Sequence, residues 1–208
     1  MSLAPWIEKD RLEAGTDEAG RGCLAGPVTA ASVILPPALA LELVAEGILD
    51  DSKKLSKKVR DVLRVRIENE ATAWAVCHIS PVEIDRINIL QASLKAMRVA
   101  TMDLRIAPEF MLIDGNRFVT EKELPPHECF IKGDGRFASI AAASVLAKTH
   151  RDERMNALHE EHPQYGWNTN AGYPTKSHRS AIADIGITQH HRKSFRQLPG
   201  QLALIKRA

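Results

Sequence analysis

The stretch L-E-A-G-T-D-E-A-G-R-G-C-L-A-G-P-V-T-A-A-S-V-I-L, Leu12 to Leu35, places two adjacent acids between two segments with strand character. A first strand is expected around Leu12 to Thr16, and the β-branched run from Val28 to Leu35 predicts a second. Asp17 and Glu18 lie directly after the first of these strands. Like charges repel and buried charges are costly, so a bound cation would explain such a pair.

The geometry of a strand limits how these two acids can act together. Neighbouring side chains on a strand point to opposite faces, so Asp17 and Glu18 can serve one site only if the chain turns there or one offers its backbone carbonyl. Gly20 and Gly22 predict such a turn. The glycine spacing through Gly26 is G-x-G-x-x-x-G, and acids at its entrance would repel a pyrophosphate, which excludes a dinucleotide-binding loop.

Hydrophobic periodicity and turn residues predict the remaining elements, which alternate between helix and strand. The first are a helix from Ser56 to Ala71 and a strand from Thr72 to Ile79. A second helix, capped at Ser80 and closed by Pro108, carries on one face Leu90, Leu94, Met97, Thr101 and Leu104. Strands at Phe110–Ile113 and Glu128–Lys132 follow, and then a helix over Ala138–Glu161 whose first half carries small side chains. This alternation predicts an α/β fold with helices packed on a mixed central sheet.

Composition is that of an ordinary globular protein, with 208 residues, 44% apolar and 26% charged. One main domain is expected, because no repeat or long linker interrupts the chain. The apolar runs are too short to span a bilayer and the N-terminus does not resemble a signal peptide, so a cytoplasmic protein is expected. Cys23, Cys77 and Cys129 are scattered, which favours small buried hydrophobic residues over disulfides or a zinc cluster.

The formal net charge of +2 does not by itself indicate a polyanionic partner. The basic residues are nevertheless grouped, at Lys53–Lys58, Lys176–Arg179 and His190–Arg196. Solvated faces would explain any one of these groups, but together they keep a nucleic-acid surface open.

Acids also follow other predicted elements. Asp114 lies at the carboxyl end of a predicted strand, where α/β folds gather their chemistry, and Ser144, Lys148 and Asp152 lie four residues apart along one helix face. Taken singly, Asp114 is typical of a turn and Asp152 of a surface ion pair. Four carboxylates without histidine or cysteine at matching spacing suit Mg²⁺ or Mn²⁺, and two such ions roughly 3.5–4 Å apart could hold the attacking water and leaving oxygen of a phosphodiester.

Five motifs now point to a known family. They are D-E-A-G-R-G at Asp17–Gly22, D-S-K-K-L-S at Asp51–Ser56, L-I-D-G-N at Leu112–Asn116, A-A-A-S-V-L-A-K-T-H-R-D at Ala141–Asp152, and H-P-Q-Y-G-W with A-G-Y-P-T between His162 and Thr175. In this order and spacing, the sequence resembles ribonuclease HII, the bacterial type 2 ribonuclease H, over nearly its whole length.

The resemblance implies a ribonuclease H-like fold in a single domain over residues 1–208, with a C-terminal helical extension from about residue 160 to 208. It implies a metal-dependent endonuclease that cuts the RNA strand of RNA/DNA hybrids and nicks 5′ to single ribonucleotides in duplex DNA. Products would carry 5′-phosphate and 3′-hydroxyl ends, two Mg²⁺ or Mn²⁺ ions would act in the active complex, and the protein would be a monomer.

The resemblance also assigns roles to individual residues. The metal-binding catalytic quartet would be Asp17, Glu18, Asp114 and Asp152. The ribose 2′-hydroxyl would be read by Gly20, Arg21 and Gly22, the neighbouring deoxyribose would stack on Tyr173, and backbone phosphates would lie near Lys53 and Lys148. From the residues alone, Tyr173 could equally be a surface ring and Lys148 a structural ion pair. For His190 and His191, packing or phosphate contact is favoured over catalysis.

Three alternatives stay open. A proofreading-type 3′–5′ exonuclease also uses four acids, but its first motif is D-x-E rather than D-E. Ribonuclease HIII carries an N-terminal substrate-binding domain, for which no room is expected before Asp17, and it lacks the arginine that stands here as Arg21. A non-catalytic hybrid-binding protein would need aromatic stacking surfaces, and aromatic content is only 5%. A sliding-clamp contact through Gln197–Ala208 has no clear motif to support it, and a frayed end is favoured there.

Overall fold

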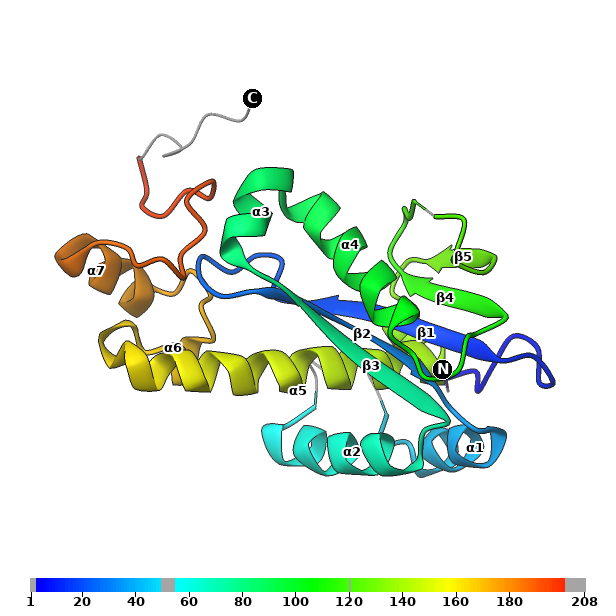
Figure 1. The fold of residues 1–208 in the computed structure, drawn as a ribbon. Helices are drawn as coiled ribbons and strands as arrows, with labels where there is room; N and C mark the ends of the chain where they lie inside the picture. Colours follow the sequence, from blue (N-terminus) through cyan, green and yellow to red (C-terminus); the bar gives the residue numbers. More distant parts are fainter. Residues whose placement is uncertain (1–2, 50–54, 120, 201–208) are drawn as a thin grey trace.

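The computed structural model describes residues 3–49, 55–119 and 121–200. A five-stranded mixed sheet with the order β3-β2-β1-β4-β5 forms its centre (Figure 1). The strands are β1 (Glu13–Ala19), β2 (Val28–Ile34), β3 (Ala73–Ile79), β4 (Phe110–Asp114) and β5 (His127–Phe130). β1, β2 and β3 pair antiparallel, whereas β1, β4 and β5 pair in parallel, so the predicted mixed α/β sheet is confirmed.

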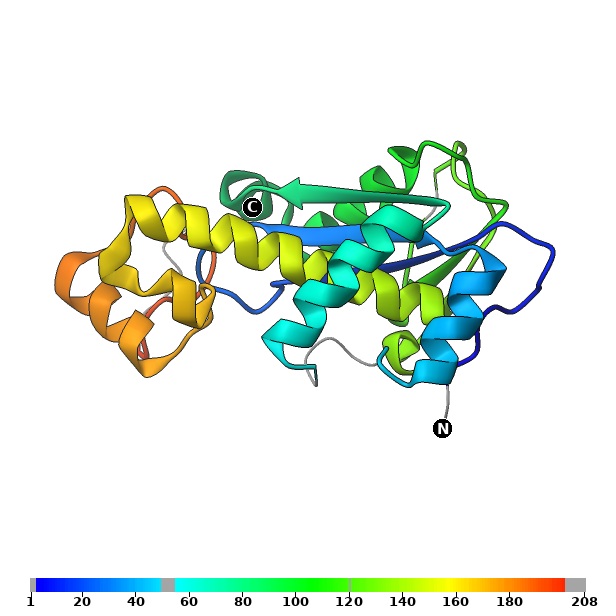
Figure 2. The same cartoon turned by 90° about the horizontal axis from the view of Figure 1, so that it is seen from below.

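One face of the sheet is covered by the long helix α5 (Ala138–Glu161), with α1 (Pro37–Glu46) and α2 (Lys57–Glu70) packed beyond it (Figure 2). The small side chains of α5 allow a close approach to β1. A Cβ atom added to Gly15 would lie 2.1 Å from the backbone carbon of Ser139, so only glycine fits at this crossing. Ser56 caps α2 by accepting the Val59 N–H, as its sequence predicts.

The other face packs against α3 (Pro81–Ile87) and α4 (Ile89–Met102), which lie above the sheet in Figure 1. The sequence predicted one helix here, and the structure divides it at Asn88. This residue has a positive φ of 68°, and its side chain accepts the N–H groups of Leu90 and Gln91. An asparagine tolerates that conformation and caps the second helix, which explains the break.

Other boundaries differ from the expectation in ways that affect the site. β1 continues through Ala19 instead of ending near Thr16, while β5 lies slightly earlier than predicted and ends at Phe130. Helix α1 had no predicted counterpart; it begins with proline at its first position and ends at Gly47 in the left-handed conformation.

The chain beyond α5 forms a helical extension past the end of the sheet, with α6 (Trp167–Asn170) and α7 (Lys176–Ile185). Its apolar core joins Trp167, Tyr165 and Ile182 to Leu158 of α5 and to Leu24 of the loop after β1. The extension is therefore anchored both to the long helix and to the glycine-rich loop. No helix within the described ranges has the length and apolar character needed to cross a membrane.

Candidate active site

Asp17 and Asp114 come together at the carboxyl ends of two parallel strands. The register pairs Thr16 of β1 with Ile113 of β4, so the next residue on each strand is one of the two acids. Both side chains therefore lie on the same face of the sheet, the face covered by α5. The predicted convergence of these two acids is thus found in the structure.

Burial and like charge make Asp17 an unusual carboxyl group. It is only 4% exposed, and its Oδ1 accepts the Glu18 N–H at 2.6 Å. Burial, followed by repulsion from Glu18 and Asp114, raises the pKa of Asp17 well above its ordinary value, although a hydrogen bond with the Ser144 side chain opposes this shift. A cation beside these acids would offset their repulsion and favour the ionised form of Asp17.

Glu18 does not share the face of Asp17, because β1 runs straight through the pair and turns only at Gly20. The turn predicted at Gly20 and Gly22 is present, but it begins only after both acids. Alternation along the strand directs Glu18 to the α4 side, where it forms an ion pair with Arg21 at 3.2 Å. Because the two side chains lie on opposite faces, Glu18 can serve the same site as Asp17 only through its backbone carbonyl.

A further acid, Asp134, lies next to this edge and was missed by the sequence analysis. Asp134 belongs to the short 3₁₀ turn Gly133–Gly135 and is 7% exposed. The preceding residue, Gly133, donates its N–H to Asp114 Oδ1 at 2.7 Å, which fixes the turn against the end of β4. The G-D-G sequence reads as an ordinary turn, and only the fold shows that it adjoins the acids.

Asp152 occupies a different part of the molecule from the other predicted acids. It lies on α5 two turns after Ser144, about 12 Å along the helix axis, and pairs with Lys148 at 2.6 Å. Its surroundings form a small polar cleft of about 240 Å³ between α2 and α5. The structure therefore brings Asp17 and Asp114 together, with the Glu18 backbone and the turn of Asp134 adjoining them, whereas Asp152 lies two turns beyond Ser144 on α5.

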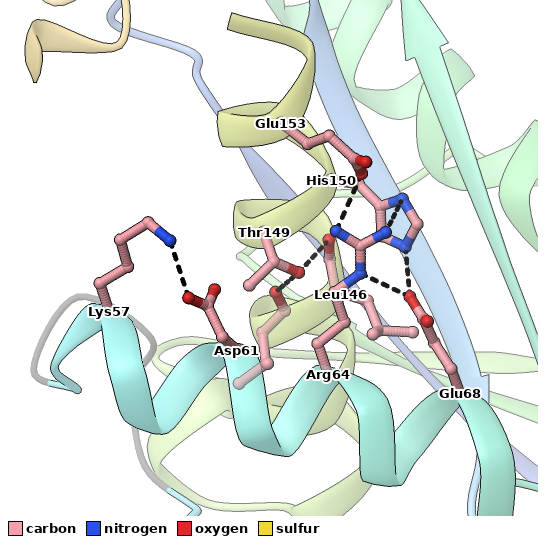
Figure 3. A network of polar contacts seen from close by, with 9 residues as sticks. Lys57, Asp61, Arg64, Glu68, Leu146, Thr149, His150 and Glu153 are labelled. Carbon is pink, nitrogen blue, oxygen red and sulfur yellow. Dashed lines mark hydrogen bonds and ion pairs between the residues drawn. The ribbon is translucent and has the colours of Figure 1, made fainter. Parts of the chain in front are cut away.

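The α2–α5 contact beside this cleft is polar (Figure 3). Arg64 of α2 binds Glu68 at 2.6 Å and reaches across to Glu153 of α5 at 2.9 Å. His150 of α5 contacts the same Glu68 at 2.8 Å. These charges are paired with one another, as in an interface that holds two helices together.

Two buried arginines shape the loop that contains Gly20, Arg21 and Gly22. The side chains of Arg151 and Arg192 are fully buried. Arg192 donates to the carbonyls of Gly20, Arg21, Gly26 and Pro27, and Arg151 to those of Ala25, Pro27 and Ala171. Burial lowers the pKa of Arg192 to about 10, which still leaves it charged at neutral pH.

The close fit of this loop depends on Gly20. Its φ is +89°, and an added Cβ would lie 1.9 Å from Nε of Arg151. Arg21 itself projects outward, with a side chain that is 53% exposed. The loop thus combines a fixed backbone with an accessible guanidinium. The sequence suggested the turn, but the two arginines that hold it lie far along the chain and carried no signal of their own.

Tyr173 lies beside this loop. The carbonyl of its neighbour Gly172 accepts the Leu24 N–H at 2.8 Å, which joins the two loops. The ring is 37% exposed, and Lys148 Nζ lies 5.9 Å from its centroid. The predicted substrate-binding residues of the Gly20–Gly22 loop, Lys148 and Tyr173 therefore lie near one another. Lys53 lies outside the described residues.

His190 and His191 lie in the extension rather than at the acids. His191 is 1% exposed and accepts the Thr188 N–H at 3.0 Å. Its Nε2 lies 3.3 Å from that of His178, and burial lowers the pKa of His191 to about 3. These contacts agree with the predicted packing role for His191.

The three cysteines are free. Only Cys23 is fully buried, and burial raises its pKa despite the nearby arginines. A thiol held protonated in this way is a poor nucleophile.

Comparison with known proteins identifies the family of the chain. The family model described as Ribonuclease HII matches residues 14–198. The Ribonuclease HII of Bacteroides thetaiotaomicron is 57% identical over 203 residues, which cover 97% of this chain and 98% of that protein.

Solved structures show the same fold. The RNase HII in the PCNA:RNase HII complex from Archaeoglobus fulgidus is 26% identical, with a TM-score of 0.74 over 92% of this chain and 98% of that chain. The crystal structure of Bst-RNase HIII in complex with Mn²⁺ is 18% identical, with a TM-score of 0.69 over 94% of this chain and 70% of that chain. By its sequence and fold the chain belongs to the ribonuclease HII family, and it is a ribonuclease H hydrolase.

Proposed function

We propose that this ribonuclease H is a metal-dependent endonuclease that nicks 5′ to single ribonucleotides in duplex DNA and also cuts the RNA strand of RNA/DNA hybrids. The observation that carries the proposal is the pairing of Asp17 and Asp114 on one face, with a raised pKa at Asp17. Such a cluster of oxygen ligands fits hard divalent ions such as Mg²⁺ or Mn²⁺.

The acids would hold two divalent ions, with Asp17 and Asp114 as direct carboxylate ligands and Glu18 contributing its backbone carbonyl. When bound, the ions supply an activated water and stabilise the departing 3′ oxygen. Ser144 keeps Asp17 oriented, and the Gly133 N–H does the same for Asp114. The products would be a 5′-phosphate and a 3′-hydroxyl without a covalent intermediate.

For the fourth acid, the geometry favours Asp134 over Asp152. Asp134 is buried beside Asp114, whereas the charge of Asp152 is matched by Lys148 at 2.6 Å. A carboxylate already paired with a lysine is a weaker candidate for a cation ligand, because the ion would have to displace that lysine.

The loop at Gly20–Gly22 would read the ribose. Its backbone is fixed by Arg192 and lies beside Tyr173, so a 2′-hydroxyl could be recognised by main-chain groups while the next sugar stacks on the ring. Contacts to the 2′-hydroxyl are how proteins distinguish RNA from DNA. Lys148 near the ring would face a backbone phosphate, and Lys53 stays in the same predicted role.

The test is cleavage of a DNA duplex that holds one ribonucleotide, compared with an all-DNA duplex and with a closed circular version of the same substrate. We expect one nick 5′ to the ribonucleotide in Mg²⁺ or Mn²⁺, on linear and circular substrates alike, and no nick with Asp114→Asn or in chelator. A requirement for a free 3′ end would instead indicate an exonuclease. Tight duplex binding without any nick by folded protein would indicate a hybrid-binding protein.

A sliding-clamp contact through the C-terminal segment has no supporting motif in the sequence, which favours a frayed end there. The Archaeoglobus relative was solved with PCNA, but most of the expected segment, residues 201–208, lies outside the described residues. We therefore make nucleic acid, and not a clamp, the partner in this proposal.

A further inference from the structure

A second group of potential metal ligands lies in the helical extension, away from the acids at β1 and β4. Glu161 and His162 end helix α5, and His190 comes from the segment that follows α7. One ligand atom from each of the three lies within 4.8 Å of the others. His190 Nε2 is 3.9 Å from Glu161 Oε2, and the two histidine rings are 5.4 Å apart between centroids.

The hydrogen bonds of the neighbouring histidines show which rings are available. His178 uses Nδ1 for the Tyr173 carbonyl at 2.9 Å, and its Nε2 accepts the Trp167 indole N–H at 3.0 Å. His191 uses Nδ1 for Thr188. Both rings are therefore committed to packing and hydrogen bonding within the protein.

His190 differs from these two. Its Nε2 atom is buried and has no hydrogen-bond partner among the described residues, although the side chain as a whole is 20% exposed. A buried ring nitrogen without a partner is costly, and a metal ion would satisfy it. The nearest complementary group is the Glu161 carboxylate, at a distance too long for a hydrogen bond.

We propose that Glu161, His162 and His190 form a binding site for a transition-metal ion of the Zn²⁺ class. Imidazole nitrogens with one carboxylate are ligands of borderline-soft ions, in contrast to the all-oxygen set at Asp17 and Asp114. Ligand atoms around tetrahedral zinc are about 3.4 Å apart, given bonds of about 2.0–2.1 Å. The observed spacing closes to this value by side-chain rotation, and Glu161 is free to rotate because it is 61% exposed.

Charge around the site is mixed. Arg154 lines the same cavity as His190 and opposes a bound cation. Glu161 would therefore contribute both a ligand atom and the negative charge that offsets Arg154. Three protein ligands leave a fourth position open to water or to an outside group.

The site would join two segments that are distant in sequence. Its ligands connect the end of α5 to the segment that carries Arg192, two residues after His190. Arg192 holds the carbonyls of Gly20 and Arg21, so a metal at His190 would stabilise the support of the ribose-reading loop. The metal would thus be structural and would take no part in hydrolysis.

The experiment is a calorimetric Zn²⁺ titration of the full chain in excess Mg²⁺, which occupies the acid site. We expect about one Zn²⁺ per chain in the wild type, binding at least tenfold weaker in His162→Gln, and an increase of melting temperature with Zn²⁺ that this variant lacks. Glu160→Gln, which removes the neighbouring exposed charge, is the matched control and should bind as the wild type does.

Histidine side-chain ¹H–¹⁵N spectra identify the ligands independently of activity. Zn²⁺ should shift the ring nitrogens of His162 and His190 and leave those of His178 unchanged, and it should do so equally in Asp17→Asn. The proposal is overturned if no Zn²⁺ binds at 100-fold molar excess, if binding is lost in Asp17→Asn, or if His162→Gln and Glu160→Gln bind like the wild type.

Discussion

Two neighbouring regions at the end of β1 handle charge in opposite ways. The acid edge places Asp17 and Asp114 on one face, next to the turn that carries Asp134, and Asp17 is repelled by Glu18 and Asp114. The loop that follows is held by the positive charges of Arg151 and Arg192, which are surrounded by backbone carbonyls. In the first region the acids repel one another, whereas in the second the buried guanidinium groups are satisfied by backbone carbonyls.

This difference distinguishes a candidate binding site, the acid edge, from a structural region, the loop held by the arginines. Backbone carbonyls accept four hydrogen bonds from Arg192 and three from Arg151, so the arginine region gains rigidity without needing a ligand. The pKa of Asp17 is raised because the group is buried and because Glu18 and Asp114 repel its charge. Such a region becomes more stable when a cation arrives, which is the behaviour of a binding site.

The largest expected effect comes from removing charge at the acid edge. Asp17→Asn should lower the cleavage rate at least about 10³-fold, because the divalent ions lose a direct ligand. The same change should raise the melting temperature in chelator, since a repulsive buried charge is gone. If Asp17→Asn loses both activity and metal-free stability, Asp17 is not a buried charge that its neighbours repel.

The opposite result is expected in the arginine region. Arg192→Met should lower the free energy of unfolding by about 3 kcal/mol, because the carbonyls of Gly20 and Arg21 lose their donor. For a chain of this size, that corresponds to a melting temperature about 6–12 °C lower. Lys176→Met, at the exposed start of α7, is the control; an equal loss there would show that the effect is not specific to the loop.

A third comparison concerns the fourth acid. Asp134→Asn should reduce cleavage about 10²-fold, whereas Asp152→Asn should reduce it less than tenfold, because only Asp134 adjoins Asp114. Steady-state rates on the single-ribonucleotide duplex, at equal Mn²⁺, decide between them. The reverse ranking would restore Asp152 to the metal-binding set that the sequence motif predicted.

The smallest effect is a pH dependence of metal-free stability. The pKa of Asp17 is raised in the folded state, so this carboxyl favours folding at low pH and that contribution is lost as the pH rises through the raised pKa. In chelator, the melting-temperature difference between Asp17→Asn and the wild type should be small near pH 4.5 and widen toward pH 8. A constant difference across this range would mean that Asp17 titrates normally.

The sequence was sufficient to predict the sheet and two acids of the acid edge, Asp17 and Asp114. Alternation of helical and strand patterns is local, so β2, β3 and the 138–161 helix were predicted within a residue or two. Asp17 and Asp114 follow strands, and the rule that parallel strands end at a common edge brings them together.

The missed features depend on contacts between distant segments. Asp134 lies in a G-D-G turn, and only the parallel pairing of β4 with β5 brings that turn to Asp114. Arg192 was grouped with surface charges because its neighbours in the chain are basic, yet it is fully buried. Burial of an arginine against carbonyls leaves no periodic pattern in a sequence, so it could not be anticipated.

The bond between Arg192 and the Gly20 carbonyl spans 172 residues, and this has a consequence for synthesis of the protein. At about 5–20 residues per second, a ribosome needs roughly 10 to 35 s to pass from one partner to the other. The strand that carries Asp17 is made early, but the loop that follows it receives its support only after Arg192 has emerged. In the nascent chain, the strand that bears Asp17 is thus complete well before Arg192 can hold the glycine-rich loop beside it.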